Sequence, residues 1–291
     1  MKSISKITLL SILAFLVTPL FSQKQAYELY NQRGRAIRYE RMLNDCKRAN
    51  VILFGEQHNN AIAHWLQFEL TKDLYEVLGD KLVLGAEMFE ADGQLIMDEY
   101  FSGLISQRSF EKEMRLWDNY KTDYKPLIEY ARENDLRFIA TNIPRRYANL
   151  VFRMGLDSLS RLPEEARHYM MPLPLEYDTT LNAYSSLMAQ NPMGMHGNPE
   201  NFRDAQAVKD ATMAFFILKN FGRGETFLHF NGAYHSDDFE SINYFLQRSV
   251  TELQIVTITT VSQEDISKLD PEHEDKANYI IAVPEAMTKT Y

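Results

Sequence analysis

Short, uninterrupted apolar runs alternate with helical segments along most of this chain. The run Asn50–Phe54 has the length and composition of a strand covered on both faces. Similar runs lie at residues 81–87, 136–141, 225–230, 253–260 and 279–283. Between the first two runs, leucines recur at helical spacing until Gly79 ends the segment. This alternation predicts an α/β fold with a mostly parallel central sheet and helices on both faces.

Two parts of the chain depart from the alternation. Residues 26–38 indicate a small hairpin that turns near Gly34, and residues 39–48 indicate a short helix. Residues 147–220 contain no strand pattern, and prolines interrupt their helical spacing. We therefore expect a helical insertion there. It is rich in methionine, which we interpret mainly as core packing.

Polar side chains follow four of the expected strands. Gly55-Glu56-Gln57-His58 ends the first, and Gly232-Ala233-Tyr234-His235 repeats the Gly-x-x-His pattern after the fourth. Because parallel strands deliver their carboxyl ends to one edge, we expect one shared rim. Its members would be Glu56, His58, Glu87, Asn142, Arg145, Asn231 and His235.

Two kinds of chemistry suit such a rim, and the spacing does not choose between them. His58, Glu87 and His235 can bind a divalent metal that activates water. Alternatively, a histidine paired with a carboxylate such as Glu56 can act as a base without metal. Arg145 can hold a carboxylate or stabilise an oxyanion. His64 lies six residues from His58, and we expect it to be exposed or partly buried.

Composition and the first residues narrow the class of protein. The 291 residues carry a formal net charge of −9, which argues against nucleic acid or an anionic membrane as the main partner. The single cysteine, Cys46, allows no internal disulfide. Lys2 and Lys6 precede the apolar run Ile7–Val17, and Ser22 follows it. This is the pattern of a signal peptide cleaved near residue 22. No lipobox cysteine is present, so we expect residues 23–291 to be periplasmic, without stable membrane insertion.

An ordered set of motifs runs along the chain: Ile52–Asn60, Gly85–Glu90, Thr141–Arg145, Ala205-Gln206 followed by Asp210 and Met213-Ala214, and Gly232–His235. As a set, these motifs resemble the ChaN family of haem-binding uptake proteins, within the wider Tiki/TraB and erythromycin-esterase-like superfamily. The resemblance covers most of residues 23–291 and implies an α/β fold, export, and haem or iron acquisition.

The resemblance also implies roles for particular residues. Haem requires an axial ligand and cations for its propionates. The insertion offers Tyr184, Met193, Met195 and His196, and Arg146 or Arg145 would supply the charge. The superfamily implies an alternative, a metal-dependent hydrolase acting on a peptide or another small molecule. In that case His58, Glu87 and His235 would act with Glu56 assisting. Whether the protein forms a homodimer is left open by the sequence.

Overall fold

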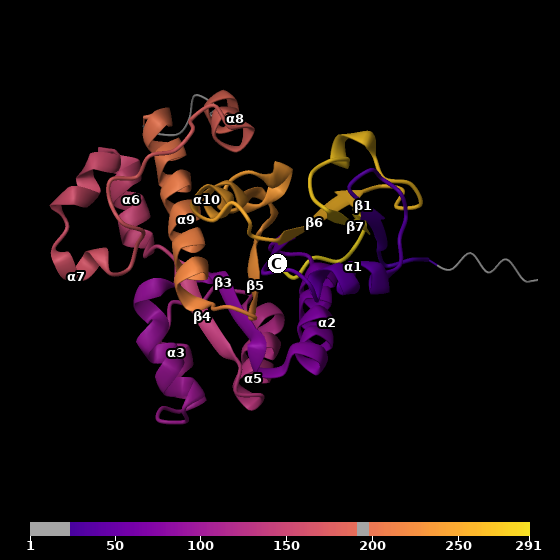
Figure 1. The fold of residues 1–291 in the computed structure, drawn as a ribbon, viewed down its shortest axis with the longest axis horizontal. Coiled ribbons are helices and arrows are strands. Elements are labelled where there is room, and N and C mark those ends of the chain that lie inside the picture. The colour runs from indigo at the N-terminus through magenta and orange to yellow at the C-terminus, as the bar shows by residue number, and fades with distance from the viewer. Residues whose placement is uncertain (1–23, 191–197) are drawn as a thin grey trace, which may run out of the picture.

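A seven-stranded sheet forms the centre of the computed structural model, which describes residues 24–190 and 198–291 (Figure 1). The spatial order is β1-β7-β6-β2-β5-β3-β4. The strands are β1 (Glu28–Asn31), β2 (Val51–Glu56), β3 (Leu82–Glu90), β4 (Arg137–Asn142), β5 (Thr226–Gly232), β6 (Ile255–Gln263) and β7 (Tyr279–Pro284). Only β1 is antiparallel to its neighbour, and the other five pairings are parallel. The predicted fold class is confirmed.

Successive residues of the central strand point to opposite faces, so a hydrophobic core forms on each face of the sheet. Ile52 and Phe54 of β2 lie in one core, and Val51 and Leu53 lie in the other. The first core lies against α1 (Tyr39–Cys46), α2 (Ala61–Leu78), α3 (Gln94–Phe101), α4 (Gln107–Glu113) and α5 (Lys125–Glu133). Because β2 is covered on both faces, its sequence is almost continuously apolar.

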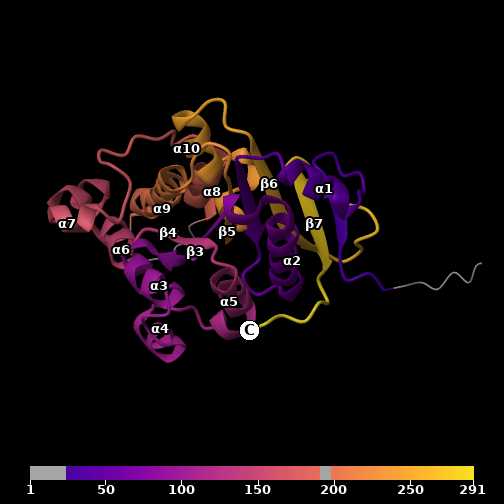
Figure 2. The same ribbon diagram turned by 60° about the horizontal axis from the view of Figure 1, so that its bottom comes forward.

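The second core lies beneath the helices that follow β4. These are α6 (Arg145–Met154), α7 (Glu164–Arg167), α8 (Asn182–Gln190) and α9 (Pro199–Asn220), and α10 (Ile242–Ser249) joins them after β5. Figure 2 shows this group on the side of the sheet away from α2 and α5. None of the helices in the described parts of the chain is long and apolar enough to cross a membrane.

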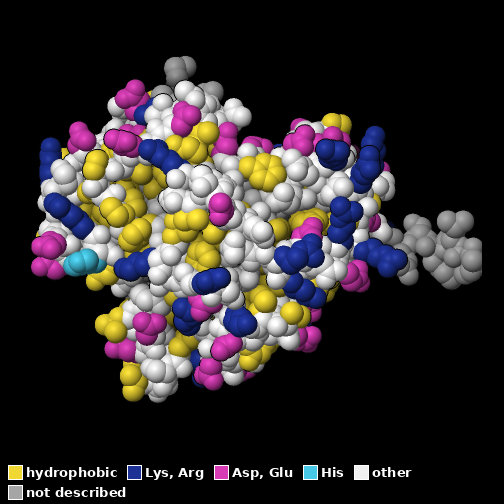
Figure 3. Space-filling view, in the orientation of Figure 1, with side chains coloured by type: hydrophobic (Ala, Val, Ile, Leu, Met, Phe, Trp, Pro, Cys, Tyr) yellow, Lys and Arg dark blue, Asp and Glu magenta, His cyan; other side chains and the backbone are white. Residues whose placement is uncertain are grey.

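The strands extend beyond their apolar runs. β3 continues to Glu90, β5 to Gly232 and β6 to Gln263, because ladder hydrogen bonds to a neighbour do not require an apolar side chain. The expected hairpin at residues 26–38 is reduced to one bridge between Tyr30 and Ala36. β1 pairs with β7 instead. Acidic and basic side chains are interspersed over the face seen in Figure 3.

Candidate functional site

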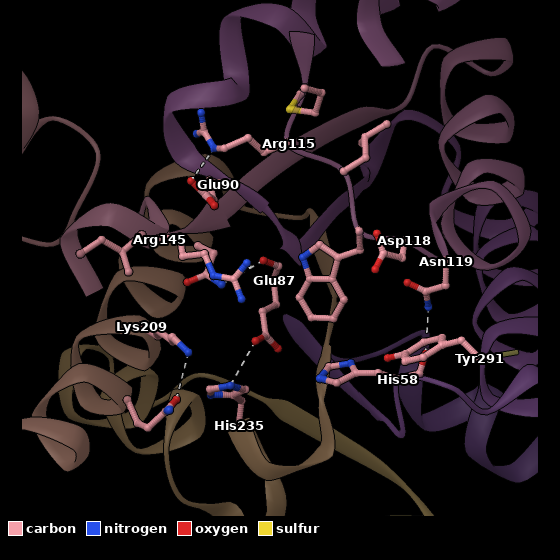
Figure 4. A pocket seen from close by; sticks show the side chains of 16 residues that line it. His58, Glu87, Glu90, Arg115, Asp118, Asn119, Arg145, Lys209, His235 and Tyr291 are labelled. Atoms are coloured by element: carbon pink, nitrogen blue, oxygen red, sulfur yellow. Dashed lines mark hydrogen bonds and ion pairs between the residues drawn. The ribbon is translucent and has the colours of Figure 1, made fainter. Parts of the chain in front are cut away.

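The carboxyl ends of the parallel strands surround one cavity of about 840 Å³. His58 follows β2, Glu87 lies on β3, and His235 follows β5, and all three line the cavity (Figure 4). Asn142 at the end of β4 and Arg145 at the start of α6 also line it. Five of the seven predicted rim residues therefore lie around one cavity. Glu56 and Asn231 do not line it: Glu56 is buried against His58, and Asn231 is fully buried and donates to the Ser236 hydroxyl.

The buried carboxylate of Glu56 fixes the orientation of the His58 ring. Its carboxylate Oε1 lies 3.0 Å from His58 Nδ1 and accepts a hydrogen bond of 2.6 Å from the Tyr124 hydroxyl. The Gln67 amide donates to the other oxygen, also at 2.6 Å. Burial lowers the pKa of His58, but the Glu56 hydrogen bond and the charge of Glu87 outweigh it, and the pKa lies above its ordinary value. His58 Nε2 forms no hydrogen bond with a residue that the structure describes.

His64 is buried and contacts the His58 backbone, so the prediction that it is exposed or partly buried is wrong. It is 5% exposed, and its Nε2 lies 3.0 Å from the His58 carbonyl oxygen. Asn119 donates to the same carbonyl at 2.9 Å and to Asp123 at 2.7 Å. His64 lies in the first turn of α2, whose N-terminus is capped by Asn60. The six-residue separation concealed this contact because the chain turns sharply before the helix begins.

His235 lies between two buried carboxylates. Its Nε2 is 3.2 Å from Glu87 Oε1, and its Nδ1 is 2.5 Å from Asp210 Oδ1. Burial favours the neutral ring, but these two charges outweigh it and raise the pKa of His235 to about 10. Burial raises the pKa of Glu87, but the positive charge of His235 outweighs burial and holds the pKa of Glu87 well below its usual range. His235 is thus an imidazolium at neutral pH.

The backbone at Gly232 brings the two histidine systems together. A Cβ atom there would lie 2.8 Å from His58 Cε1 and 3.5 Å from Glu87 Oε2. Its amide N–H also donates to Glu87 Oε2 at 2.8 Å. A side chain at this position would force the His58 ring to shift, because the ring occupies the space of a Cβ atom. The close approach of the His58 ring to the backbone of Gly232 explains why the second Gly-x-x-His pattern begins with glycine.

The cavity walls differ in character. The apolar residues that line the cavity are Met114, Leu116, Trp117 and Ile143. The Trp117 and His58 rings pack edge-to-face, with their centroids 4.8 Å apart. Cations are present on the wall formed by α6 and α9, where Arg145 and Lys209 are located. Such a combination suits a ligand with an apolar body and anionic groups.

The cofactor residues expected in the insertion are not brought to the cavity. Tyr184 is fully buried, and its hydroxyl donates to Asp210 at 2.8 Å, so it is not accessible as an axial ligand. Arg146 points away, pairing with Asp92 at 2.5 Å and lying over the Tyr147 ring. Met193, Met195 and His196 fall outside the described residues. Adjacent helical residues face different directions, which separates Arg145 from Arg146.

The expected metal site at His58, Glu87 and His235 is not supported. Within residues 24–190 and 198–291, no group of three or more His, Cys, Asp or Glu side chains is arranged to hold a metal ion. The three residues do meet, but both ring nitrogens of His235 and Nδ1 of His58 are already engaged by carboxylates.

Two residues beside the cavity, Asp210 and Lys209 on α9, had no role assigned from the sequence. For Asp210 a signal existed: it is a carboxylate on the otherwise apolar face that includes Ala207, Val208 and Ala211. A charge on a buried helical face requires a partner. The partner, His235, could not be identified from spacing.

Comparisons with known proteins show the family and the fold of the chain. Residues 42–246 match the sequence profile of the family described as haem-binding uptake, Tiki superfamily, ChaN. The chain belongs to this family. The ChaN match includes His58, Glu87, Arg145, Lys209 and His235, and it ends before β6. The predicted family resemblance is confirmed.

Solved structures show the same fold. The ChaN protein of Campylobacter jejuni, whose structure is described as cofacial haem binding, superposes with a TM-score of 0.67 at 17% identity. That similarity covers 89% of this chain and 97% of the other. A succinoglycan biosynthesis protein superposes with a TM-score of 0.50 at 11% identity, covering 84% and 89% of the two chains.

A curated relative comes from Arabidopsis thaliana. Protein RETICULATA-RELATED 5, chloroplastic, is 25% identical over 193 residues, which is 62% of this chain. This chain spans only about a quarter of that protein's length.

Proposed function

We propose that this ChaN-family protein binds haem in the cavity at the carboxyl edge of its sheet, as an exported component of haem or iron uptake. The observation that carries the proposal is the combination of His58, an apolar wall and cations around one cavity. Membership of a haem-binding uptake family supports it, as does the cofacial haem binding described for the Campylobacter jejuni protein.

The residues present fit haem as a ligand. A volume of about 840 Å³ lies within the range of about 300–1,000 Å³ typical of small-molecule sites. Haem iron commonly takes a histidine nitrogen. A ligating histidine usually holds its second nitrogen against a carboxylate, as His58 holds Nδ1 against Glu56. We therefore assign His58 Nε2 as the iron ligand.

His235 has a different role in this proposal. Both its nitrogens face carboxylates, and it is 6% exposed. It fixes Glu87 and Asp210 and so shapes the floor of the cavity beside His58.

The periplasmic location remains part of the proposal. It is supported by the signal-peptide pattern of Lys2, Lys6 and Ile7–Val17. The metal-dependent hydrolase alternative relied on a metal held by His58, Glu87 and His235, and no group of three or more His, Cys, Asp or Glu side chains in residues 24–190 and 198–291 is arranged to hold one.

The test is a spectroscopic titration with haemin. Wild type should show a saturable Soret shift, and His58→Ala should lower affinity by at least about tenfold, because the iron loses its ligand. His168→Ala is the matched control, since His168 is exposed and does not line the cavity. A linear, non-saturating increase in absorbance with wild-type protein would contradict specific haem binding. An unchanged His58→Ala titration would remove His58 as the ligand.

A further inference from the structure

We propose that a second cavity, at the opposite edge of the sheet from the site described above, binds phosphate groups through Arg33, Arg35 and Arg41. The three arginines line a cavity of about 600 Å³. Ile255 at the start of β6 and Tyr279 at the start of β7 line it too. β6 and β7 run parallel to β2, so this cavity lies at the amino ends of the parallel strands, whereas the first cavity lies at their carboxyl ends.

Positive charge is concentrated in this part of an acidic protein. The full chain has 31 Lys and Arg against 40 Asp and Glu, but residues 24–48 have seven against three. Among the interspersed charges in Figure 3, dark blue side chains gather over α1 and β1, on the right. A positive region of this kind raises the local concentration of anions. The local field therefore favours an anionic ligand.

The guanidinium groups of the three arginines are available to such a ligand. None of them forms an ion pair or a hydrogen bond with a residue that the structure describes, where only the backbone of these arginines is engaged. Asp45 is the one acidic residue among the described residues that line the cavity. Its carboxylate already pairs with Arg48 and accepts a hydrogen bond from the Tyr279 hydroxyl. The cavity thus holds an excess of positive charge.

The chain fixes these arginines before any ligand binds. Asn31 Oδ1, at the end of β1, accepts the backbone N–H groups of Arg33 and Arg35 at 3.1 and 3.0 Å. Gly34 between them has a φ of +66°, a left-handed conformation that favours glycine. Arg41 comes from a separate element, the first turn of α1. Two elements therefore converge on one cavity with three guanidinium groups.

Phosphate suits this set better than a carboxylate does. A phosphate monoester carries about two negative charges and three acceptor oxygens, so it accepts hydrogen bonds from more than one guanidinium fork. A carboxylate has one charge and two oxygens, and a single fork satisfies it. Ile37, Ile255 and Val256 are half-buried at the same cavity, so an apolar body attached to the phosphate also finds contacts. A free phosphate compound and a lipid headgroup share this chemistry.

The experiment uses two kinds of probe. Inorganic pyrophosphate and citrate are titrated calorimetrically at equal ionic strength, and flotation is measured with vesicles of phosphatidylcholine alone or mixed with phosphatidylglycerol. Wild type should bind pyrophosphate saturably and citrate at least about tenfold more weakly. Arg33→Gln, Arg35→Gln and Arg41→Gln should each weaken pyrophosphate binding on the order of tenfold, because a charge-assisted hydrogen bond is lost.

Arg108→Gln is the matched control, because Arg108 is exposed on α4, carries the same charge and does not line this cavity. It should leave pyrophosphate binding and flotation unchanged. The haemin titration should be the same for all four variants, because the haem cavity lies at the other edge of the sheet.

The two probes also distinguish the sources of phosphate. Binding of pyrophosphate that depends on the three arginines supports a soluble phosphate compound, and flotation with phosphatidylglycerol that depends on them supports a lipid headgroup. The proposal would be overturned by absent pyrophosphate binding together with equal flotation on both vesicles. Equal affinity for citrate and pyrophosphate, or an equal loss in Arg108→Gln, would overturn it too. Haem binding is read separately from the Soret shift, so failure of one site is distinguishable from failure of the other.

Discussion

At the scale of single residues, His235 is the side chain that balances the charge of the buried site. Glu87 and Asp210 are 5% and 0% exposed, and both depend on its imidazolium. We predict that His235→Gln lowers the free energy of unfolding by about 3–5 kcal/mol at pH 7, because two carboxylates lose their counter-ion. Urea denaturation followed by circular dichroism measures this loss.

His235 also makes the free energy of unfolding depend on pH. The pKa of His235 is raised to about 10, whereas the unfolded chain has the ordinary value of 6.5. Stabilisation is therefore complete below pH 6.5 and is lost as pH rises from 6.5 towards 10. His235→Gln should lack this decline. The double variant with Glu87→Gln should recover part of the loss, and equal stabilities of all three proteins would contradict the role of His235.

At the scale of elements, the segment after β7 returns across the site. Thr290 N–H donates to the Asn59 carbonyl at 3.0 Å, its hydroxyl donates to Asp123 at 2.8 Å, and Tyr291 lines the cavity. The segment thus ties the His58 turn to the π-helical turn Tyr120–Tyr124. We predict that Thr290→Val costs about 1 kcal/mol of stability and weakens haemin binding several-fold.

Thr288→Val is the control for this segment, since Thr288 is exposed and lies outside the cavity. Urea denaturation and haemin titration are measured on both variants. Equal effects of the two substitutions would show that the contacts of Thr290 do not hold the site.

At the scale of the whole molecule, residues 1–22 should act only in export. We predict that the full chain, expressed in a Gram-negative host, appears in the periplasmic fraction. Its mass should be shortened by about the first 22 residues. A chain starting at Gln23 should stay in the cytoplasm yet unfold at the same temperature and bind haemin equally. Unprocessed protein in the cytoplasmic fraction would contradict export.

The sequence by itself determined the strands and the rim, because those patterns are local. Six core strands were predicted from apolar runs, since a strand covered on both faces needs no polar residue. His58, Glu87 and His235 were placed at one edge because parallel strands share a direction. The antiparallel pairing of β1 with β7 was missed, because a four-residue strand gives no signal of its partner.

Only the tertiary structure decided which side chains meet across the sheet. Asp210 lies 25 residues before His235, and helix α9 must pack on the sheet before the two touch. Packing also buried Tyr184 and separated Arg145 from Arg146, which are neighbours in sequence. Spacing along a chain fixes the direction of a residue within its own element. Contacts between elements depend on how those elements pack, and the availability of His58 and Arg145 for a ligand follows from that packing.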